Sequence, residues 1–287
     1  MRIVFKALNG ISILLLIALF PLIYYSSEDN IIFDISLLPQ IIIKFIMGLI
    51  EGHSWYFQEG SRDALLILEI LNRFKISFGY VVLSGLITLL ITLLFGVRFW
   101  RFYFRYLEFT LGLIGIIPNF ILILVFQITI VKLNNIFNHH FFLVASSSTS
   151  DSAFFLPILT LVVVTIYFIV ESTANKTKEV LGEDYILFSK SKGLSKTEIY
   201  FKHVMLNIIP FIKAELHLVI SILLSNLFII EYLYNIRGVT TLLFLHSKDG
   251  YQYNLVVFCL VSLIILYFLS YLTILSFIKI LERYLTR

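Results

Sequence analysis

A line of polar side chains spaced four residues apart lies within one of the most apolar stretches of the chain. His217, Ser221 and Ser225 recur at this spacing, and Glu215 and Asn226 flank them. Residues four apart share one face of an α-helix, so an imidazole and two hydroxyls would lie along a single face. Polar groups inside a membrane either line a cavity or hydrogen-bond to a neighbouring helix. The residues alone leave both interpretations open.

A second polar stretch, residues 176–210, lies between two long apolar runs. Its lysines are Lys176, Lys178, Lys190, Lys192, Lys196 and Lys202. A segment this polar cannot cross a bilayer, so we expect it to lie in water beside the membrane. Its apolar residues recur at helical spacing on both sides of Gly193, which predicts two short helices joined by a tight turn. Such a helical knob is more typical of a docking surface than of a catalytic site.

Local signals predict how the first helix of this knob packs and where it ends. Leu181, Tyr185 and Phe188 are spaced four and three residues apart, which predicts that they share its apolar face. Gly193 can take the left-handed conformation that ends a helix at little cost.

The second helix of the knob has its own start signal. Ser195 and Glu198 have the spacing of a capping box. Pro210 lies where the next apolar run begins, and an early helical position tolerates proline. The apolar residues of this helix are Ile199, Val204 and Leu206.

The sequence contains none of the common motifs for nucleotide binding or hydrolysis, since GxxxxGK[ST], HExxH and GxSxG are all absent. We therefore expect no catalytic residue in this chain. The histidines that could suggest a metal site are His53, His139, His140 and His246. Two adjacent histidines point in different directions on most backbones, and no carboxylate cluster lies beside them. We expect no metal site, no cofactor and no nucleic-acid partner.

The composition is that of an integral membrane protein. The 287 residues are 59% hydrophobic and 14% charged, whereas soluble domains carry about a quarter charged residues. The mean hydropathy is +0.95. We predict an all-α membrane fold with about six spans of about 20 residues and a cytoplasmic loop. The predicted spans are residues 7–25, 76–95, 111–131, 154–170, 211–232 and 255–278. We expect Pro118 to kink the third of them.

Positive charge sets the expected orientation. Arginine and lysine gather within residues 2–6, 98–105, 176–202 and 279–287. With six spans, all four groups lie on one side of the membrane, and the positive-inside rule makes that side cytoplasmic. Both termini would then be cytoplasmic.

Two N-terminal segments need separate interpretation. The apolar run after Arg2 and Lys6 could be a signal peptide, but residues 26–29 offer no small-x-small cleavage site, so we expect a retained anchor. Residues 26–75 would form an external segment. Within it, residues 31–50 are apolar but interrupted by acidic, basic and proline residues, which predicts amphipathic helices at the membrane surface.

An ordered set of residues in the knob carries a family resemblance. It consists of Glu183, Asp184, Tyr185, Ser189, Ser191, Lys192, Gly193, Leu194, Ser195, His203, Asn207 and Pro210. This set resembles the coupling loop of permeases in binding-protein-dependent ABC importers, above all the B-type subunit of the dipeptide/oligopeptide/nickel family. Outside the loop the matching residues are Ile117, Pro118, Asn119, Phe120, Leu156, Pro157, Glu231, Tyr234, Gly238, Asp249 and Tyr251. The resemblance covers roughly residues 70–272.

The resemblance implies a single transmembrane permease domain over residues 1–287 in a bacterial inner or plasma membrane, with core spans in 76–280 and the coupling loop at 176–207. In that family, the turn matching Gly193 enters a groove of a cytoplasmic ATPase. ATP binding closes two such ATPases and rocks two permease subunits between inward-open and outward-open states. The partners implied are a second homologous permease subunit, two cytoplasmic ATPase subunits, an external solute-binding protein and membrane lipid.

The implied cargo is a peptide, nickel or a metal chelate. If the polar line faces a cavity, the translocation path would include Pro118, His217, Ser221, Ser225 and Asn226. Two other functional classes remain as alternatives. A secondary transporter driven by an ion gradient would typically show inverted repeats, and we find no convincing internal repeat. A membrane-embedded enzyme would need catalytic groups at bilayer depth, and no recognised constellation is present. Gly193 could also be no more than a helix stop.

Overall fold

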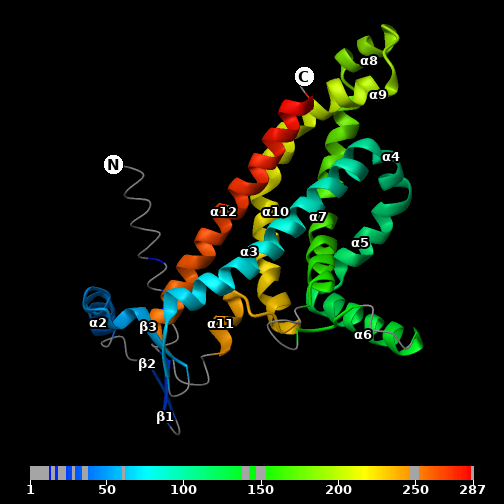
Figure 1. The fold of residues 1–287 in the computed structure, drawn as a ribbon. Coiled ribbons are helices and arrows are strands. Elements are labelled where there is room, and N and C mark those ends of the chain that lie inside the picture. Colours follow the sequence, from blue (N-terminus) through cyan, green and yellow to red (C-terminus); the bar gives the residue numbers. More distant parts are fainter. Residues whose placement is uncertain are drawn as a thin grey trace. The chain divides into compact units, whose positions relative to one another are not determined.

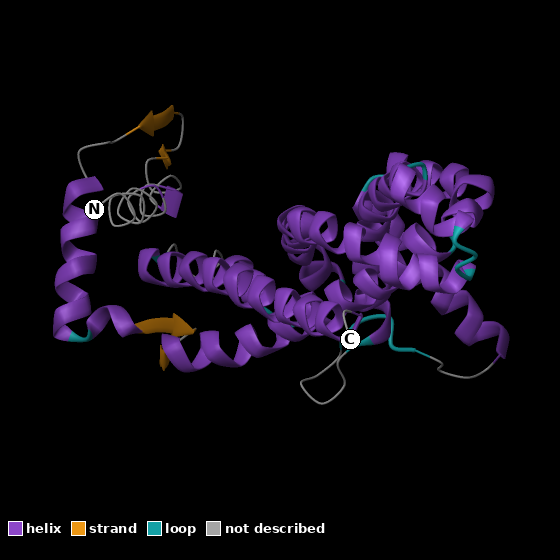
Figure 2. Ribbon diagram, turned by 90° about the horizontal axis from the view of Figure 1, so that it is seen from above, coloured by secondary structure: helices purple, strands orange, loops and turns teal. Residues whose placement is uncertain are grey.

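The computed structural model describes residues 13, 17–18, 24–27, 30–33, 38–59, 62–137, 142–146, 153–245 and 252–285. The described regular structure is helical apart from four short strands (Figure 2). The chain forms two compact units, Met1–Ser77 with Arg237–Leu266 and Phe78–Ile236 with Tyr267–Arg287. Two long helices, α3 (Leu66–Ile91) and α12 (Tyr253–Leu285), contribute residues to both units.

The regular elements described in the second unit are all helices, and three of them have widened π-helical turns. After α3 they are π-helical η2 (Thr92–Arg98), α4 (Trp100–Phe102), π-helical η3 (Tyr103–Leu107), α5 (Glu108–Ile116), α6 (Asn119–Phe137), α7 (Phe155–Leu181), α8 (Asp184–Ser191), α9 (Lys196–Glu198), π-helical η4 (Ile199–Val204) and α10 (Met205–Leu233). Helices α7 and α10 run side by side, and η2 packs on α7 (Figure 1). These contacts form the base on which the knob at α8 and α9 stands.

The first unit contains two antiparallel hairpins. Strand β1 (Tyr24–Ser27) pairs with β2 (Asn30–Phe33), and β3 (Tyr56–Glu59) pairs with β4 (Arg62–Leu65). The remaining elements are α2 (Leu38–Glu51), the 3-10 turn η1 (His53–Trp55) and α11 (Val239–Leu245). The buried residues Phe57, Leu66, Ile70, Val239, Leu242, Leu255 and Cys259 form a core cluster in this unit.

The predicted helices over residues 31–50 are only partly present. Helix α2 is amphipathic, as predicted, and packs Ile42 and Phe45 near Tyr253. Residues 30–33, however, form strand β2. Ile31 and Ile32 are β-branched, which favours strands, and the adjacent β1 supplies the hydrogen-bonding partner that decides the conformation.

Within the described residues, five helices are long and apolar enough to cross a membrane: Leu66–Arg98, Asn119–Phe137, Phe155–Leu181, Lys196–Leu233 and Tyr253–Leu285. The predicted all-α membrane fold is therefore confirmed. These helices contain the second, fourth, fifth and sixth predicted spans, apart from residue 154. The predicted first span, residues 7–25, falls largely outside the described residues.

The predicted third span, residues 111–131, is wrong as a single kinked helix. The chain leaves the helix at Ile117 and Pro118, between α5 and α6. Proline has no N–H and its ring clashes with the preceding helical turn, so a break replaces the expected kink. The new helix starts at once, because the Pro118 carbonyl accepts the N–H of Ile121 at 2.9 Å.

The second span also begins earlier than predicted, at Leu66 rather than residue 76. Arg73 does not end it, because its Nε bonds to Glu69 Oε1 one turn earlier on the same helix. An ion pair at this spacing lowers the cost of burying the guanidinium.

A single glycine sets the closest approach between η2 and α7. A Cβ added at Gly96 would lie 3.0 Å from Thr173 Cγ2 and 3.4 Å from the Val170 carbonyl oxygen. This glycine therefore lets the Thr173 side chain and the Val170 carbonyl pack closely against the backbone of η2.

Replacing Gly96 with valine is expected to destabilise the protein by about 1–3 kcal/mol, because the added methyl groups overpack this contact. The apparent melting temperature in detergent measures the effect. Gly112→Ala is the matched control: no atom lies within 4 Å of an added Cβ there, and alanine is the better helix former. Equal melting temperatures for the two variants would contradict this account of the contact.

Candidate functional site

The knob begins where α7 ends. Helix α7 stops at Leu181, and Glu183 adopts an extended conformation (φ −70°, ψ 146°) that starts α8. Asp184 then lies in the first turn of α8. Both carboxylates are thus at a helix N-terminus, where the helix dipole favours negative charge.

Only the first of the two predicted short helices is short, because the second is the start of the helical run Lys196–Leu233. The turn between them has the hydrogen bonding of a Schellman motif. Gly193 has φ 78°, the left-handed conformation predicted from the sequence. Its N–H donates to the Lys190 carbonyl at 3.0 Å, and the N–H of Leu194 donates to the Ser189 carbonyl at 3.4 Å. No atom lies within 4 Å of an added Cβ at Gly193. Backbone conformation, and not crowding within this chain, therefore makes glycine the favoured residue.

The predicted capping box is also present. Ser195 Oγ accepts the N–H of Glu198 at 3.2 Å, and the Glu198 carboxylate accepts the N–H of Ser195 at 3.3 Å. From Lys196 the chain is continuously helical through α9, η4 and α10 to Leu233. Pro210 is therefore inside a helix, which corrects its predicted place in the first turn of a new one.

The packed face of α8 differs from the predicted one. Ile186 is fully buried and Ser189 nearly so, whereas Tyr185 is 40% exposed and Phe188 60% exposed. Leu187, at 52%, is exposed as well. Residues 185–188 of this short helix are all apolar, and they point in different directions around it. Only Ile186 faces the core that α7 and α10 form.

The other loop residues divide between contacts within the knob and solvent. Asn207 Nδ2 donates to the His203 carbonyl at 2.7 Å, and Ser189 Oγ donates to the Tyr185 carbonyl at 2.7 Å. Burial and the Glu183 carboxylate raise the pKa of the Tyr185 phenol, against the effect of a hydrogen bond with Asn207. The phenol therefore stays neutral at physiological pH. Lys192 is exposed, with Nζ 4.4 Å from the centre of the Phe188 ring.

The polar line on α10 faces outward from this unit. His217, Ser221 and Ser225 are all exposed and lie on one face, as their spacing predicted. Each serine donates to the carbonyl four residues earlier, at 2.8 Å. Their oxygens keep lone pairs that can accept further hydrogen bonds.

Two tyrosines on α12 hold the histidine in place, and sequence reasoning missed both. His217 Nδ1 lies 2.7 Å from Tyr267 Oη. The imidazole also stacks on Tyr271 with ring centres 4.3 Å apart. The spacing of four between these tyrosines was the available signal, but nothing in the sequence indicated that α12 would face His217.

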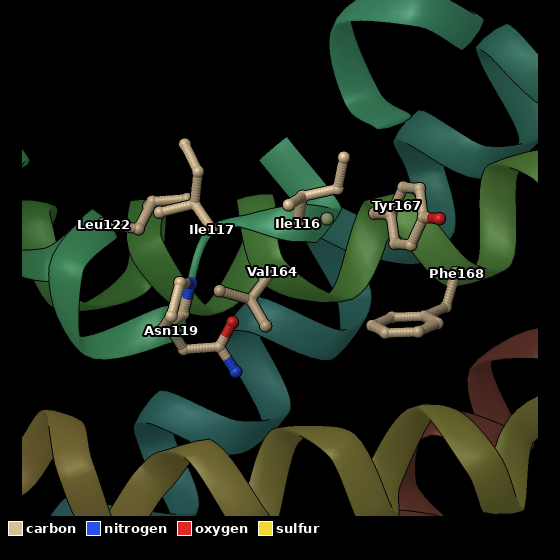
Figure 3. Close-up of a pocket in the computed structure, with 9 residues that line it drawn as sticks. Ile116, Ile117, Asn119, Leu122, Val164, Tyr167 and Phe168 are labelled. Atoms are coloured by element: carbon tan, nitrogen blue, oxygen red, sulfur yellow. The ribbon is translucent and has the colours of Figure 1, made fainter. Parts of the chain in front are cut away.

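Asn226 differs from the rest of the predicted path residues, because it is buried. Its Oδ1 accepts Asn119 Nδ2 from α6 at 2.6 Å, and its Nδ2 donates to the Ile222 carbonyl. Asn226 thus joins two helices. Pro118 is exposed and lines a pocket of about 240 Å³ beside the break between α5 and α6, to which α7 contributes Tyr167 and Phe168 (Figure 3).

Comparisons with known proteins relate this chain to transport permeases. Residues 84–287 match the family of binding-protein-dependent transport system inner membrane components. The chain is 25% identical over 224 residues to the oligopeptide transport system permease protein OppC of Lactococcus lactis subsp. lactis, with 74% of this chain and 65% of that protein covered. It is 29% identical over 253 residues to the dipeptide transport system permease protein DppB of Bacillus subtilis, covering 86% and 78%.

The match to OppC spans just under two thirds of that protein's length, 65% in each of two strains of Lactococcus lactis. Among solved structures, the fold is similar to a chain of the MetNI methionine ABC transporter in an inward-facing conformation. The TM-score is 0.57 with 17% identity, covering 77% of this chain and 98% of that one. That similarity concerns the fold.

Proposed function

This chain belongs to the family of binding-protein-dependent transport system inner membrane components, and from this premise we propose that it is a permease subunit of an ATP-driven importer. It forms half of the translocation path and catalyses no covalent reaction itself. The observation that carries the proposal is the knob over residues 176–210, whose exposed side chains include Leu187 and Phe188. Apolar side chains exposed together on an aqueous surface are typical of a docking site.

The knob has the features of a docking surface for an ATPase. Its tip is open around Gly193, since no atom lies within 4 Å of an added Cβ, and a partner groove can approach the backbone there. Lys190, Lys192 and Lys196 surround the turn and favour an acidic groove. We assign the coupling role to this turn, with the capping box of Ser195 and Glu198 holding its shape.

One continuous helical run connects the Gly193 turn to the membrane-spanning part of α10. The 38 residues Lys196–Leu233 carry the capping box at one end and the polar line of His217, Ser221 and Ser225 further along. A motion imposed on the turn would therefore move the polar line as part of the same rod. We propose that these three exposed side chains face the translocation path, whereas Asn226 fixes α10 to α6.

The expected partners are a second homologous permease subunit, two cytoplasmic ATPase subunits and an external solute-binding protein. We propose that the knob and the C-terminal residues 279–287 are cytoplasmic, because both are rich in basic residues, as the positive-inside rule requires. Oligopeptide and dipeptide permeases among the relatives favour peptides as cargo over a metal chelate. Family membership also favours an ATP-driven importer over a secondary transporter or a membrane enzyme.

Mild-detergent purification of the tagged chain from native membranes, followed by mass spectrometry, tests the proposal. We expect stoichiometric recovery of an ATPase with a GxxxxGK[ST] motif and of a second permease. An associated solute-binding protein would then identify the cargo, because its bound ligand can be extracted and analysed. Recovery of the chain alone, stable and with native lipid, would contradict the proposal and favour a secondary transporter.

A further inference from the structure

We propose that the bend between α3 and α5, residues 98–109, binds the headgroups of anionic phospholipids. This basic–aromatic bend comprises the end of η2, then α4 and η3, and the start of α5. The proposal depends on the membrane placement of the spans and not on the transport function.

The cations of the bend have aromatic neighbours and no carboxylate partners. Arg98, Arg101 and Arg105 lie 5.5, 5.3 and 5.3 Å from the ring centres of Phe99, Trp100 and Tyr106. Across the part of the chain that the structure describes, none of these guanidinium groups lies within 4 Å of a carboxylate. Glu108 is the one acid in the bend, so the segment carries a net positive charge that an external anion can neutralise.

The depth of these cations follows from the helix that carries them. The apolar run that starts at Leu66 and is long enough to cross a membrane ends at Arg98, and Arg101 and Arg105 follow within seven residues. We therefore place the three arginines near the bilayer surface. On the inner side the bend is fixed by Tyr103, which is 1% exposed and packs on Val170 and Ala174 of α7. This packing fixes the backbone that carries the arginines, and their exposed side chains can reach lipid phosphates beside it.

The uncovered side of the bend has the composition of a membrane interface. Its exposed rings are Phe99, Phe102, Tyr106 and Phe109, the last 75% exposed. They recur at spacings of three and four residues, and the first three each follow an arginine directly, so rings and guanidinium groups form adjacent stripes. Aromatic rings are favoured at the boundary between headgroups and acyl chains, while guanidinium groups match the geometry of phosphate oxygens. Lipid fits both stripes at once, which an acidic protein surface alone would not.

Lys178 of α7 adds a fourth cation next to the three arginines of the bend. It is exposed on α7, and its Nζ lies 5.8 Å from the centre of the Phe104 ring. The bend therefore presents cations from two helices to one region of the membrane surface. Basic residues near an anionic leaflet favour anionic lipid by about fivefold each.

Tryptophan fluorescence can test this proposal, because the chain has two tryptophans and one of them lies in the bend. In a Trp55→Phe variant, Trp100 is the sole reporter; its Nε1 bonds to Tyr200 Oη at 2.8 Å, which fixes its position. The full chain is placed in nanodiscs that contain brominated phosphatidylglycerol or brominated phosphatidylcholine at equal mole fraction. We expect the anionic lipid to quench Trp100 with at least about fivefold higher apparent affinity, and salt to weaken this preference.

Two triple variants in the Trp55→Phe background locate the effect. Arg98→Gln, Arg101→Gln and Arg105→Gln together should remove most of the preference, leaving the part that Lys178 contributes. Lys190→Gln, Lys192→Gln and Lys196→Gln remove the same charge from the knob and should leave the preference unchanged. If the arginine triple variant fails to fold, Arg101→Gln alone should reduce the preference by about fivefold.

Equal quenching by the two lipids in the parent protein would overturn the proposal. So would a preference that the arginine substitutions leave intact or that the lysine substitutions abolish. A bend that shows no lipid preference, but whose arginine substitutions remove co-purifying ATPase, would be a protein contact and not a lipid site.

Discussion

Replacing Gly193 with valine is expected to lower substrate uptake about tenfold or more while leaving the amount of protein in the membrane unchanged. The residue has φ 78°, and a β-branched side chain in that region costs about 1–3 kcal/mol. The turn would move to a conformation with negative φ and lose the two hydrogen bonds that close it, from Gly193 to Lys190 and from Leu194 to Ser189. Uptake of labelled peptide by cells and the ATPase rate of the purified complex measure the effect.

A Gly193→Asn variant distinguishes two explanations for the glycine: the shape of the turn, and a direct contact between the bare backbone and an ATPase. Asparagine tolerates the left-handed conformation but adds a side chain at the tip. If coupling needs only the shape of the turn, Gly193→Asn should retain most of the uptake. If an ATPase groove must contact the bare backbone, Gly193→Asn should also lose it. Unimpaired uptake in Gly193→Val would leave Gly193 as a helix stop with no coupling role.

The parts of this site that could be predicted depend on interactions between residues close in sequence. Ser195 and Glu198 satisfy each other's backbone amides within a single turn, so their spacing alone indicates the helix start. The same holds for Gly193, because the Schellman turn uses only residues 189–194. The line of His217, Ser221 and Ser225 was predictable for a similar reason, since spacing along a helix fixes which residues share a face.

Features that depend on distant contacts could not be predicted. Residues 185–188 of α8 are all apolar, so periodicity does not select the buried one, and the position of α7 and α10 decides in favour of Ile186. Likewise, hydropathy treats residues 111–131 as one span, because it does not register whether the chain breaks at Pro118. The buried pair of Asn119 and Asn226 joins helices more than a hundred residues apart in sequence.

The corrected face of α8 leads to a second large expected effect. Replacing both Leu187 and Phe188 with serine should reduce the recovery of the ATPase with the tagged chain about tenfold or more. Both side chains are more than half exposed, and apolar anchors of this kind carry much of the energy of an interface. The melting temperature of the isolated chain should change little, because exposed substitutions usually alter stability by no more than about 0.5 kcal/mol.

Ile186→Ala is the matched control on the same helix. This side chain is fully buried, so its truncation should cost about 2–5 kcal/mol and lower the melting temperature. Any loss of ATPase recovery in this variant would accompany that destabilisation, whereas the double serine variant should lose recovery at an unchanged melting temperature. Full recovery of the ATPase by the double serine variant would show that α8 is not the docking surface. Leu187 and Phe188 would then have to contact another partner, and the Gly193 turn alone would have the coupling role.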